Sequence, residues 1–260
     1  MGRFHRHDDG TVHTHDHDHD HDHGDHDHGD HSGYATGSQR IDVLEAIFAE
    51  NDVRADYNRD AFARNGVRAL NLMSSPGSGK TTVLAATLDE LAGEFAVGVI
   101  EGDIATDLDA AKLDGRGAQI SLLNTGNGFG GECHLDAPMV NRALQGLDLS
   151  RLNLVIIENV GNLVCPAEFD VGEHAKAMVY SVTEGEDKPL KYPVMFRAVD
   201  VVLLNKIDLA PYLDVDVDAY IAGIRQVNPT ATILPVSART GAGMAEWFGW
   251  LRRFMASTPT

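Results

Sequence analysis

Residues 74–81 read Ser-Ser-Pro-Gly-Ser-Gly-Lys-Thr, which matches a phosphate-binding loop at every position except the first, where Ser74 replaces the usual glycine. The apolar run at 67–73 predicts a buried strand before the loop, and 82–92 carries leucines at helical spacing after it. A strand, a glycine turn and a helix in this order are the context in which the motif binds phosphate. A Gly/Ser turn with a surface lysine would not account for this flanking pattern.

The chemistry of the loop follows from its residue types. Gly77 and Gly79 let backbone N–H groups curl around a phosphate without a Cβ in the way, and the helix N-terminus adds partial positive charge. Lys80 can reach the β- and γ-phosphates, and the Thr81 hydroxyl can hold Mg²⁺. The nucleotide-binding residues predicted in this segment are Gly77, Ser78, Gly79, Lys80, Thr81 and Thr82.

The chain has 260 residues, 43% of them hydrophobic, which is enough for one large α/β domain or two small ones. Its formal net charge of -18 argues against nucleic acid as a partner, because phosphate backbones need clustered Lys and Arg. No apolar run is long enough to span a bilayer and the N-terminus has no signal-peptide core, so we expect no membrane partner and a cytoplasmic protein. The two cysteines do not make a disulfide framework and are expected to be thiols or metal ligands.

The first 31 residues form a separate segment that holds 11 of the 13 histidines and nine aspartates, largely in alternation. No apolar residue recurs at a structural period, so 1–38 is predicted to be a disordered tail and linker, and 39–260 the folded domain. Imidazoles bind Ni²⁺, Zn²⁺, Cu²⁺ and Co²⁺, which favours a flexible metal store over an expression tag or a solvated polyampholyte. The histidines assigned to this store are His13, His15, His17, His19, His21, His23, His26, His28 and His31.

The rest of the chain alternates between predicted strands and predicted helices. Strands are expected at 67–73, 97–101, 118–123, 153–158, 177–182, 201–204 and 233–236, and helices at 41–63, 82–92, 138–147, 217–227 and 244–255. Most strands are continuous apolar runs, which is typical of a parallel sheet buried on both faces. The pattern predicts an α/β fold, a mainly parallel sheet with helices on both faces.

The sequence Asn-Lys-Ile-Asp at 205–208 follows a predicted strand and is typical of a guanine-binding site. The Asp208 carboxylate can accept hydrogen bonds from guanine N1–H and the 2-amino group, which adenine does not offer in that arrangement. Asn205 can bond the base edge, and the stem of Lys206 can lie over the ring. A helix N-cap is the alternative role for Asp208. A backbone N–H that can meet guanine O6 follows the next strand, at Ser237 and Ala238.

Residues 158–161 read Glu-Asn-Val-Gly at the end of the strongest strand, where GTPases usually carry Asp-x-x-Gly and the glycine senses the γ-phosphate. Asp103, after another strand, can hold a Mg²⁺ water or orient the attacking water, although it can equally be an ordinary loop carboxylate. The predicted catalytic residues are Lys80, Asp103 and Gly161, and the predicted Mg²⁺ residues are Thr81, Asp103 and Glu158.

A second constellation consists of Cys133, His134 and Cys165. Two thiolates and an imidazole suit a soft or borderline ion such as Zn²⁺ or Ni²⁺. Composition alone favours the alternative, two inert buried cysteines and a satisfied histidine. The metal interpretation gains weight because Cys165 lies only four residues after Gly161, the expected γ-phosphate sensor. Three ligands leave the coordination incomplete, so water or a second subunit is needed to complete it.

These motifs together resemble the HypB family of GTPases, which help to insert nickel into [NiFe]-hydrogenase. The segments that carry the resemblance are SSPGSGKTT at 74–82, EGD at 101–103, CHLD at 133–136, ENVGNLVCP at 158–166, SVTEGEDKP at 181–189 and NKID at 205–208. The resemblance covers essentially all of 39–260. The chain departs from some relatives in having no cysteine before Cys133, and its stretch 126–132 is a few residues longer than the family pattern.

The resemblance implies a P-loop NTPase fold of the dimerising SIMIBI type that binds GTP and Mg²⁺ and hydrolyses GTP. It implies Ni²⁺ or Zn²⁺ at Cys133, His134 and Cys165 near the interface of a homodimer that GTP and metal favour. It also implies two partners, a HypA-type nickel chaperone and the hydrogenase large subunit. Members with a His-rich N-terminal segment store nickel in it.

Three other functions are considered. The related urease nickel GTPases usually carry Cys-Pro-His where this chain has Cys133-His134-Leu135. A metal-buffering protein with a vestigial GTPase would use the tail as its functional part. A P-loop kinase is disfavoured, because Asn205 and Asp208 specify guanine and kinases commonly take ATP.

Overall fold

The computed structural model describes residues 5–6, 12–13, 38–102, 113–123 and 134–257, and for residues before 46 it describes the backbone alone. The chain divides into two units, Met1–Asp42 and Val43–Thr260. In the first unit β1 (His5–Arg6) pairs antiparallel with β2 (Val12–His13). These four residues differ from the expected lack of regular structure, since a two-residue pairing needs only backbone hydrogen bonds and no apolar core. The other tail histidines lie outside the described residues.

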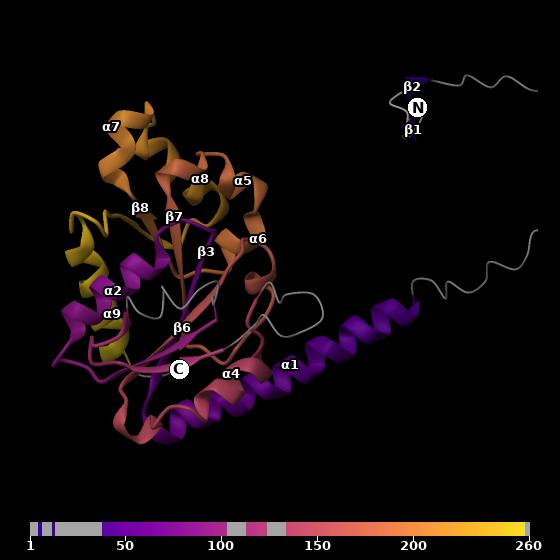
Figure 1. The fold of residues 1–260 in the computed structure, drawn as a ribbon, viewed down its shortest axis with the longest axis vertical. Coiled ribbons are helices and arrows are strands. Elements are labelled where there is room, and N and C mark those ends of the chain that lie inside the picture. Colours follow the sequence, from indigo (N-terminus) through magenta and orange to yellow (C-terminus); the bar gives the residue numbers. More distant parts are fainter. Residues whose placement is uncertain (1–4, 7–11, 14–37, 103–112, 124–133, 258–260) are drawn as a thin grey trace, which may run out of the picture. The chain divides into compact units, whose positions relative to one another are not determined.

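The second unit is built on a seven-stranded, entirely parallel sheet with strand order β5-β4-β6-β3-β7-β8-β9, which confirms the predicted fold class (Figure 1). Each of the seven predicted strands is present within three residues of its expected bounds. The bounds are β3 (Arg68–Ser74), β4 (Val97–Glu101), β5 (Gln119–Leu122), β6 (Leu154–Gly161), β7 (Ala175–Ser181), β8 (Val201–Asn205) and β9 (Thr232–Pro235).

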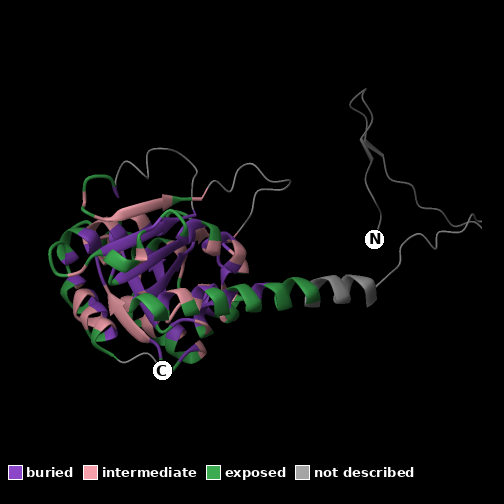
Figure 2. Cartoon of the chain, turned by 90° about the horizontal axis from the view of Figure 1, so that it is seen from below, coloured by how far each residue is buried: buried purple, intermediate pink, exposed green. Residues whose placement is uncertain are grey.

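Successive strand residues pack on opposite faces of the sheet, and helices cover both. On one face Leu70 and Leu72 join a core with α2 (Lys80–Leu91) and α9 (Met244–Ala256). On the other face Ala69 and Ile157 pack with α1 (Ser38–Asn65) and α4 (Ala137–Leu144). Farther along that face, β7 and β8 pack with α6 (Pro193–Arg197) and α8 (Val217–Val227). The five inner strands are therefore the most buried part of the sheet, whereas the edge strands β5 and β9 are only half-buried (Figure 2).

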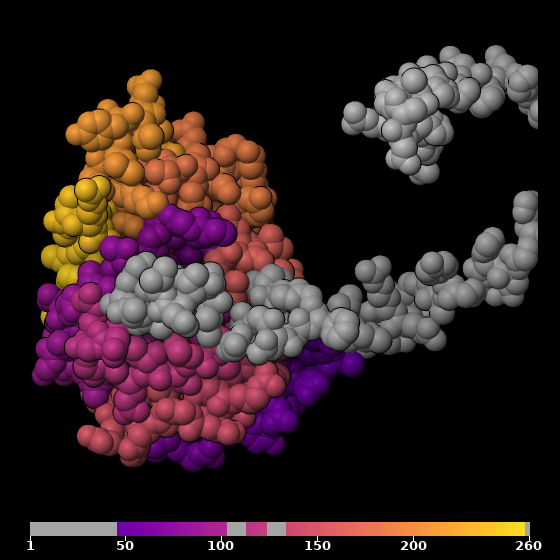
Figure 3. All heavy atoms as spheres, in the orientation of Figure 1, coloured from indigo at the N-terminus to yellow at the C-terminus, as the bar shows by residue number. Residues whose placement is uncertain are grey.

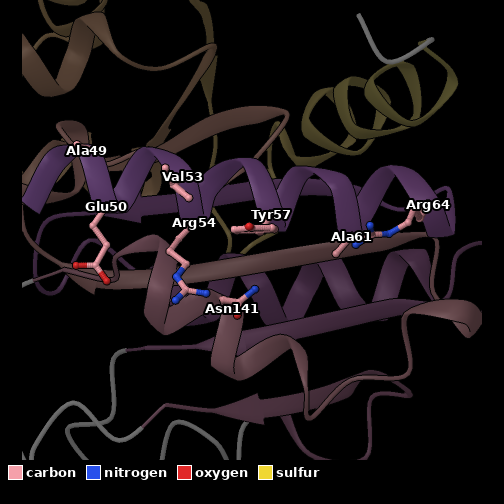
Figure 4. A pocket seen from close by; sticks show the side chains of 8 residues that line it. All are labelled: Ala49, Glu50, Val53, Arg54, Tyr57, Ala61, Arg64 and Asn141. Carbon is pink, nitrogen blue, oxygen red and sulfur yellow. The ribbon is translucent and has the colours of Figure 1, made fainter.

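Helix α1 contributes one narrow buried stripe. Its buried residues Asn51, Ala55, Asn58 and Phe62 recur every three or four positions, as expected for one face of a helix. The opposite face is exposed, as Figure 2 shows. Along that exposed face lies a hollow of about 700 Å³ (Figure 4), lined by Ala49, Glu50, Val53, Arg54, Tyr57, Ala61, Arg64 and Asn141. The helix ends before Gly66, whose φ of +67° is in the left-handed region.

Several short elements have no counterpart among the sequence predictions. They are α5 (Lys188–Lys191), α6, α7 (Ala210–Leu213) and the single-turn helices η2 (Leu149–Arg151), η3 (Cys165–Ala167), η4 (Val182–Glu184) and η5 (Ile207–Leu209). The helix predicted at 138–147 is α4, which begins one residue earlier and ends at Leu144. Its start is fixed by Asp136, whose carboxylate accepts a hydrogen bond from Met139 N–H at 2.7 Å.

All carboxyl ends of the strands meet along one edge of the parallel sheet. The phosphate-binding loop follows β3, and the segments after β4, β6, β7, β8 and β9 emerge beside it. In open α/β sheets this edge is where ligands bind. None of the described helices is both long and apolar enough to cross a bilayer.

Candidate nucleotide site and the adjoining metal loop

The loop between β3 and α2 has the backbone of a phosphate cradle. Gly77 and Gly79 adopt φ values of +73° and +98°, which are costly for any residue with a Cβ. A Cβ on Gly79 would also lie 2.6 Å from Asn205 Nδ2. The loop lines a pocket of about 380 Å³, and α2 begins at Lys80, so its first N–H groups face the same region. These are the residues expected to hold phosphate.

Three predicted residues meet at the start of α2. The Thr81 hydroxyl donates to Glu158 Oε1 at 3.2 Å, and Lys80 Nζ lies 3.8 Å from the same oxygen. Lys80 and Glu158 are buried, with side-chain exposures of 5% and 1%. A hydroxyl and a carboxylate beside a phosphate loop are the hard oxygen ligands that Mg²⁺ prefers, so the residues present fit that ion. Asp103, the third expected Mg²⁺ residue, lies outside the described residues.

The end of β6 lies against the start of the phosphate loop. Gly161 pairs with Ser74 across the sheet, so the expected γ-phosphate sensor sits beside the first residue of the motif. Asn159 was not identified as a site residue from the sequence. Its main-chain carbonyl accepts a hydrogen bond from Lys80 Nζ.

A second pocket, of about 550 Å³, lies where a base is expected. Its lining includes Asp208, whose Oδ1 is buried and has no hydrogen-bond partner among the described residues. A buried carboxylate oxygen without a donor is costly, and guanine N1–H and N2–H are the donors that the motif predicts for it. Lys206 adopts a left-handed φ of 62° and donates from Nζ to Gly77 O at 2.6 Å, which stretches its stem along the pocket.

Asn205 ties the base pocket to the phosphate loop. Its Nδ2 donates to Ser78 O at 2.9 Å and its Oδ1 accepts from Ala238 N–H at 3.1 Å. This bridging role adds to the base-edge contact expected from the sequence. The N–H of Ser237 donates to Ala242 O at 2.8 Å, so both N–H groups predicted to face guanine O6 have partners within the protein. A contact between either one and a base remains a prediction.

The two pockets adjoin and share Gly79, Thr82 and Lys206 in their lining. In the face shown by Figure 3, the purple atoms of the phosphate loop and α2 lie directly against orange and yellow atoms of the C-terminal third. Segments more than a hundred residues apart therefore enclose one continuous site with a phosphate half and a base half.

Glu184 was also missed by sequence reasoning. Its carboxylate accepts from the Ser75 hydroxyl of the phosphate loop and, at 2.9 Å, from Ser181 N–H, closing a capping box at the end of β7. Burial raises the pKa of Glu184 above the ordinary carboxyl value, while the hydrogen bonds from Ser75 and Ser181 oppose the shift. The Ser-x-x-Glu spacing at 181–184 is the signal that could have identified it.

The expected metal residues are partly described. His134 stacks on Phe169 with ring centroids 4.1 Å apart, and Phe169 in turn contacts Phe48 of α1 at 5.2 Å. Cys165 opens η3, four residues before Phe169. Cys133 lies outside the described residues, and the residues that are described hold no group of three His, Cys, Asp or Glu arranged to bind an ion. The three-ligand metal site remains a prediction.

Comparisons with known proteins agree on one family. A family model described as the CobW/HypB/UreG nucleotide-binding domain matches residues 68–235. The chain is 50% identical over 223 residues to the hydrogenase maturation factor HypB of Azotobacter chroococcum mcd 1, which covers 86% of this chain and 72% of that protein.

Two solved structures are similar throughout the folded domain. The crystal structure of the hydrogenase maturation factor HypB from Archaeoglobus fulgidus superposes with a TM-score of 0.74 at 37% identity, covering 80% of this chain and 99% of that one. HypB from Helicobacter pylori, crystallised in complex with nickel, gives a TM-score of 0.73 at 34% identity, covering 80% and 95%.

Proposed function

Because the chain belongs to the HypB family of hydrogenase maturation factors, we propose that it is a GTP-hydrolysing metallochaperone that delivers Ni²⁺ to the large subunit of a [NiFe]-hydrogenase. The observation that carries the nucleotide part is the buried Asp208 Oδ1, which has no hydrogen-bond partner in the described part of the chain and lies in a pocket continuous with the phosphate loop. This carboxylate suits guanine and leaves adenine without a matching donor pair.

In this proposal the phosphate half performs the hydrolysis. Lys80 and the N–H groups of the loop bind the β- and γ-phosphates, and Thr81, Glu158 and Asp103 hold Mg²⁺ directly or through water. The metal ion, when bound, neutralises the charge that develops on the transferred phosphoryl group. Asp103 orients the attacking water and Gly161 senses the γ-phosphate. The positions of Lys80, Thr81, Glu158 and Gly161 around one point of the loop support these roles.

The cargo half of the proposal assigns Ni²⁺, with Zn²⁺ as the alternative ion, to Cys133, His134 and Cys165. The nickel complex of Helicobacter pylori HypB supports nickel as the ion that a member of this family binds. A GTP-favoured homodimer supplies the missing coordination, and a HypA-type nickel chaperone exchanges the ion with it. Hydrolysis to GDP loosens the dimer and releases the ion.

The nucleotide assignment is tested by turnover. Purified protein with Mg²⁺ is given GTP, ATP or XTP, and phosphate release is followed. We expect hydrolysis of GTP and far slower hydrolysis of ATP, because Asp208 faces the base. Equal turnover of GTP and ATP would contradict the assignment of guanine.

The metal switch is tested by titrating Ni²⁺ into tail-deleted protein that holds either GDP or a non-hydrolysable GTP analogue. We expect tighter Ni²⁺ binding and more dimer with the GTP analogue, and by linkage the same factor in nucleotide affinity with and without Ni²⁺. Cys165→Ala should abolish this coupling and leave GTP binding intact. Equal affinity and equal oligomeric state with both nucleotides would refute the switch.

The tail is proposed to be a metal reservoir that acts independently of GTP turnover. Removing residues 1–31, which hold 11 of the 13 histidines, should sharply lower the number of Ni²⁺ ions bound and leave the hydrolysis rate nearly unchanged. The tail sites should also empty below about pH 6, where imidazole gains a proton. A truncated protein that binds as many ions as the full chain would exclude the reservoir.

A further inference from the structure

Asn159 occupies an irregular position at the end of β6. Leu72 pairs with Glu158 and Ser74 pairs with Gly161, so β6 carries one more residue than β3 between these two pairs. Such a bulge turns a side chain away from the regular alternation of a strand and is frequent next to functional sites. Asn159 is fully buried at this bulge.

Every polar group of the Asn159 side chain has a partner. Oδ1 accepts from Leu135 N–H at 3.0 Å and from Val160 N–H at 2.9 Å, and Nδ2 donates to Asn71 Oδ1 at 3.3 Å. The orientation of the amide is determined by chemistry, because the two backbone N–H groups can only donate and must face the oxygen. The main-chain carbonyl of the same residue accepts from Lys80 Nζ. Asn159 therefore joins the phosphate lysine to the residue after His134.

Leu135 is well placed to transmit a movement of Asn159 to His134, the residue that precedes it. Its side chain is fully buried and lies so close to Gly102 that a Cβ there would be 2.6 Å from it. Its N–H is the one bonded to Asn159, and the preceding residue is His134, whose ring stacks on Phe169. A shift of the Leu135 peptide thus moves the backbone of a proposed nickel ligand directly.

The far side of the Asn159 amide is held still. Asn71 lies in the centre of the sheet on β3, and its Nδ2 donates to Glu173 Oε1 at 3.4 Å. Glu173 is itself buried and lies 3.3 Å from Lys176 Nζ. Because this end is fixed by several buried contacts, a change at the Lys80 contact is directed towards Leu135.

We propose that Asn159 is a positioning residue that transmits the phosphate state of the nucleotide site to the His134 loop, an inference that rests on the proposed function. A charged phosphate oxygen that accepts a hydrogen bond from Lys80 Nζ draws the ammonium towards the nucleotide and so weakens its bond to the Asn159 carbonyl. The peptide at the bulge shifts when that bond weakens. The amide on the same residue shifts with it and moves Leu135 and His134.

The test compares two buried asparagines that hold neighbouring backbone groups. Asn159→Ala removes the bond to Leu135 N–H. The matched control, Asn51→Ala, removes a bond of 2.9 Å to Ala137 N–H and one of 2.8 Å to Asp170 O, and within the described part of the chain Asn51 makes no hydrogen bond to the phosphate loop. Each full-length protein is loaded with GDP or a non-hydrolysable GTP analogue and titrated with Ni²⁺. The readout is the thiolate-to-nickel charge-transfer absorption, to which the histidine tail does not contribute.

In the wild-type protein we expect the two nucleotides to give Ni²⁺ affinities that differ by roughly 5- to 150-fold, the usual range of coupling between sites. Asn159→Ala should bring this ratio to within about twofold of unity, and Asn51→Ala should keep it. A purely structural role predicts instead that both alanine variants lose it equally, which would overturn the proposal.

The outcomes separate this inference from the function on which it rests. If the wild-type protein shows no difference between the nucleotides, the metal switch and the role of Asn159 are both wrong. If the wild-type protein shows the difference and Asn159→Ala keeps it, only the role of Asn159 is wrong.

Amide hydrogen exchange in the unmodified chain tests the same step without any substitution. Leu135 N–H, bonded to Asn159, should exchange at different rates in the GDP and GTP-analogue complexes. Met139 N–H, bonded to Asp136 in the same segment, should exchange equally in both. Unchanged exchange at Leu135 would overturn the proposal even if Asn159→Ala failed to fold.

Discussion

The phosphate half and the base half of the site are built in different ways. In the phosphate half, buried groups from β6 and α2 bond one another: Lys80 to Asn159 and Thr81 to Glu158. In the base half, Asp208 Oδ1 has no partner among the described residues. When a nucleotide binds, groups such as Lys80 can exchange a protein partner for a phosphate oxygen, and the partner that is released can then move. An acceptor held without a partner can only select, because a ligand that lacks the matching donor leaves it unsatisfied.

Two neighbouring residues join the two halves. Asn205 and Lys206 of the base half both bond main-chain carbonyls of the phosphate loop, at Ser78 and Gly77. The halves therefore keep their spacing while each performs its own task. The following substitutions test this division of labour.

Removing the ammonium of the phosphate half should have the largest effect. Lys80→Ala should lower GTP turnover roughly 100- to 1000-fold, the usual cost of losing one preorganised contact to a developing charge. Phosphate release under saturating GTP measures it. Lys191→Ala is the control, since its exposed ammonium pairs only with Asp187 among the ion pairs of the described residues, and it should retain full turnover. Comparable losses in both variants would refute the role of Lys80.

Changing the acceptor of the base half should alter which base is bound, with little effect on the rate at which a bound nucleotide is hydrolysed. Asp208→Asn should weaken GTP roughly 10- to 100-fold and favour xanthine nucleotide, whose 2-oxo group accepts from the new amide. Turnover of bound XTP should approach that of the wild-type protein with GTP. Asp216→Asn changes a helix cap, bonded to Asp218 N–H at 2.9 Å, and should not change the base preference. An unchanged GTP preference in Asp208→Asn would remove the assignment.

A methyl group at the junction should disturb both halves together. Gly79→Ala and Gly77→Ala each force a non-glycine residue into a left-handed φ. Only the first also places its Cβ 2.6 Å from Asn205 Nδ2, whereas no atom of the described residues lies within 4 Å of a Cβ at Gly77. Overpacking costs about 1–3 kcal/mol, so Gly79→Ala should weaken nucleotide binding roughly tenfold more than Gly77→Ala. Calorimetry with GDP measures both, and equal losses would mean that the junction does not matter.

The smallest expected effect concerns Glu184, which supports the phosphate loop through Ser75. Because burial raises the pKa of Glu184, the folded chain holds that proton more tightly than the unfolded chain. The free energy of unfolding should therefore fall as pH rises from the ordinary carboxyl pKa through the raised one. Glu184→Gln should lose this slope, and Ser75→Ala should steepen it by removing a bond that lowers the pKa.

Melting temperatures between about pH 4 and pH 8 measure these slopes, with a shift of roughly 2–4 °C for each kcal/mol in a domain of this size. Identical slopes for Glu184→Gln and the wild-type protein would show that Glu184 does not contribute.

The strands of the sheet and the longer helices between them could be predicted from the sequence, because the signals for them are local. Residues 97–100 and 154–157 contain no polar side chain, and their strands are found where expected. The helices α5, α6 and α7 were missed because each is only four or five residues long, and α5 begins Lys-Pro. Packing against α8, not local propensity, holds α5 and α6.

The motifs of the site were predictable for the same reason, and its side-chain partners were not. The motif at 74–81 predicts phosphate binding by itself, and the motif that contains Asn205 and Asp208 predicts guanine binding. Asn159 bonds groups of Lys80, Leu135 and Asn71, residues 24 to 88 positions away. Nothing in the local pattern of β6 distinguishes a bridging asparagine from a turn residue, because the bulge that turns it inward is created by pairing with β3.

The position of β3 in the middle of the sheet governs the order in which the protein can be built. Its first residue, Arg68, pairs with Leu154 of β6, and Leu70 pairs with Ala175 of β7, so the strand that carries the phosphate loop leaves the ribosome long before either neighbour. At a synthesis rate of roughly 5–20 residues per second, it waits several seconds for them. During that wait the backbone N–H and C=O groups along both of its edges have no strand to pair with, and its apolar side chains are uncovered, so the strand can pair with another chain. The strand that carries the phosphate-binding loop is thus also a segment at which a nascent chain is exposed to misassembly.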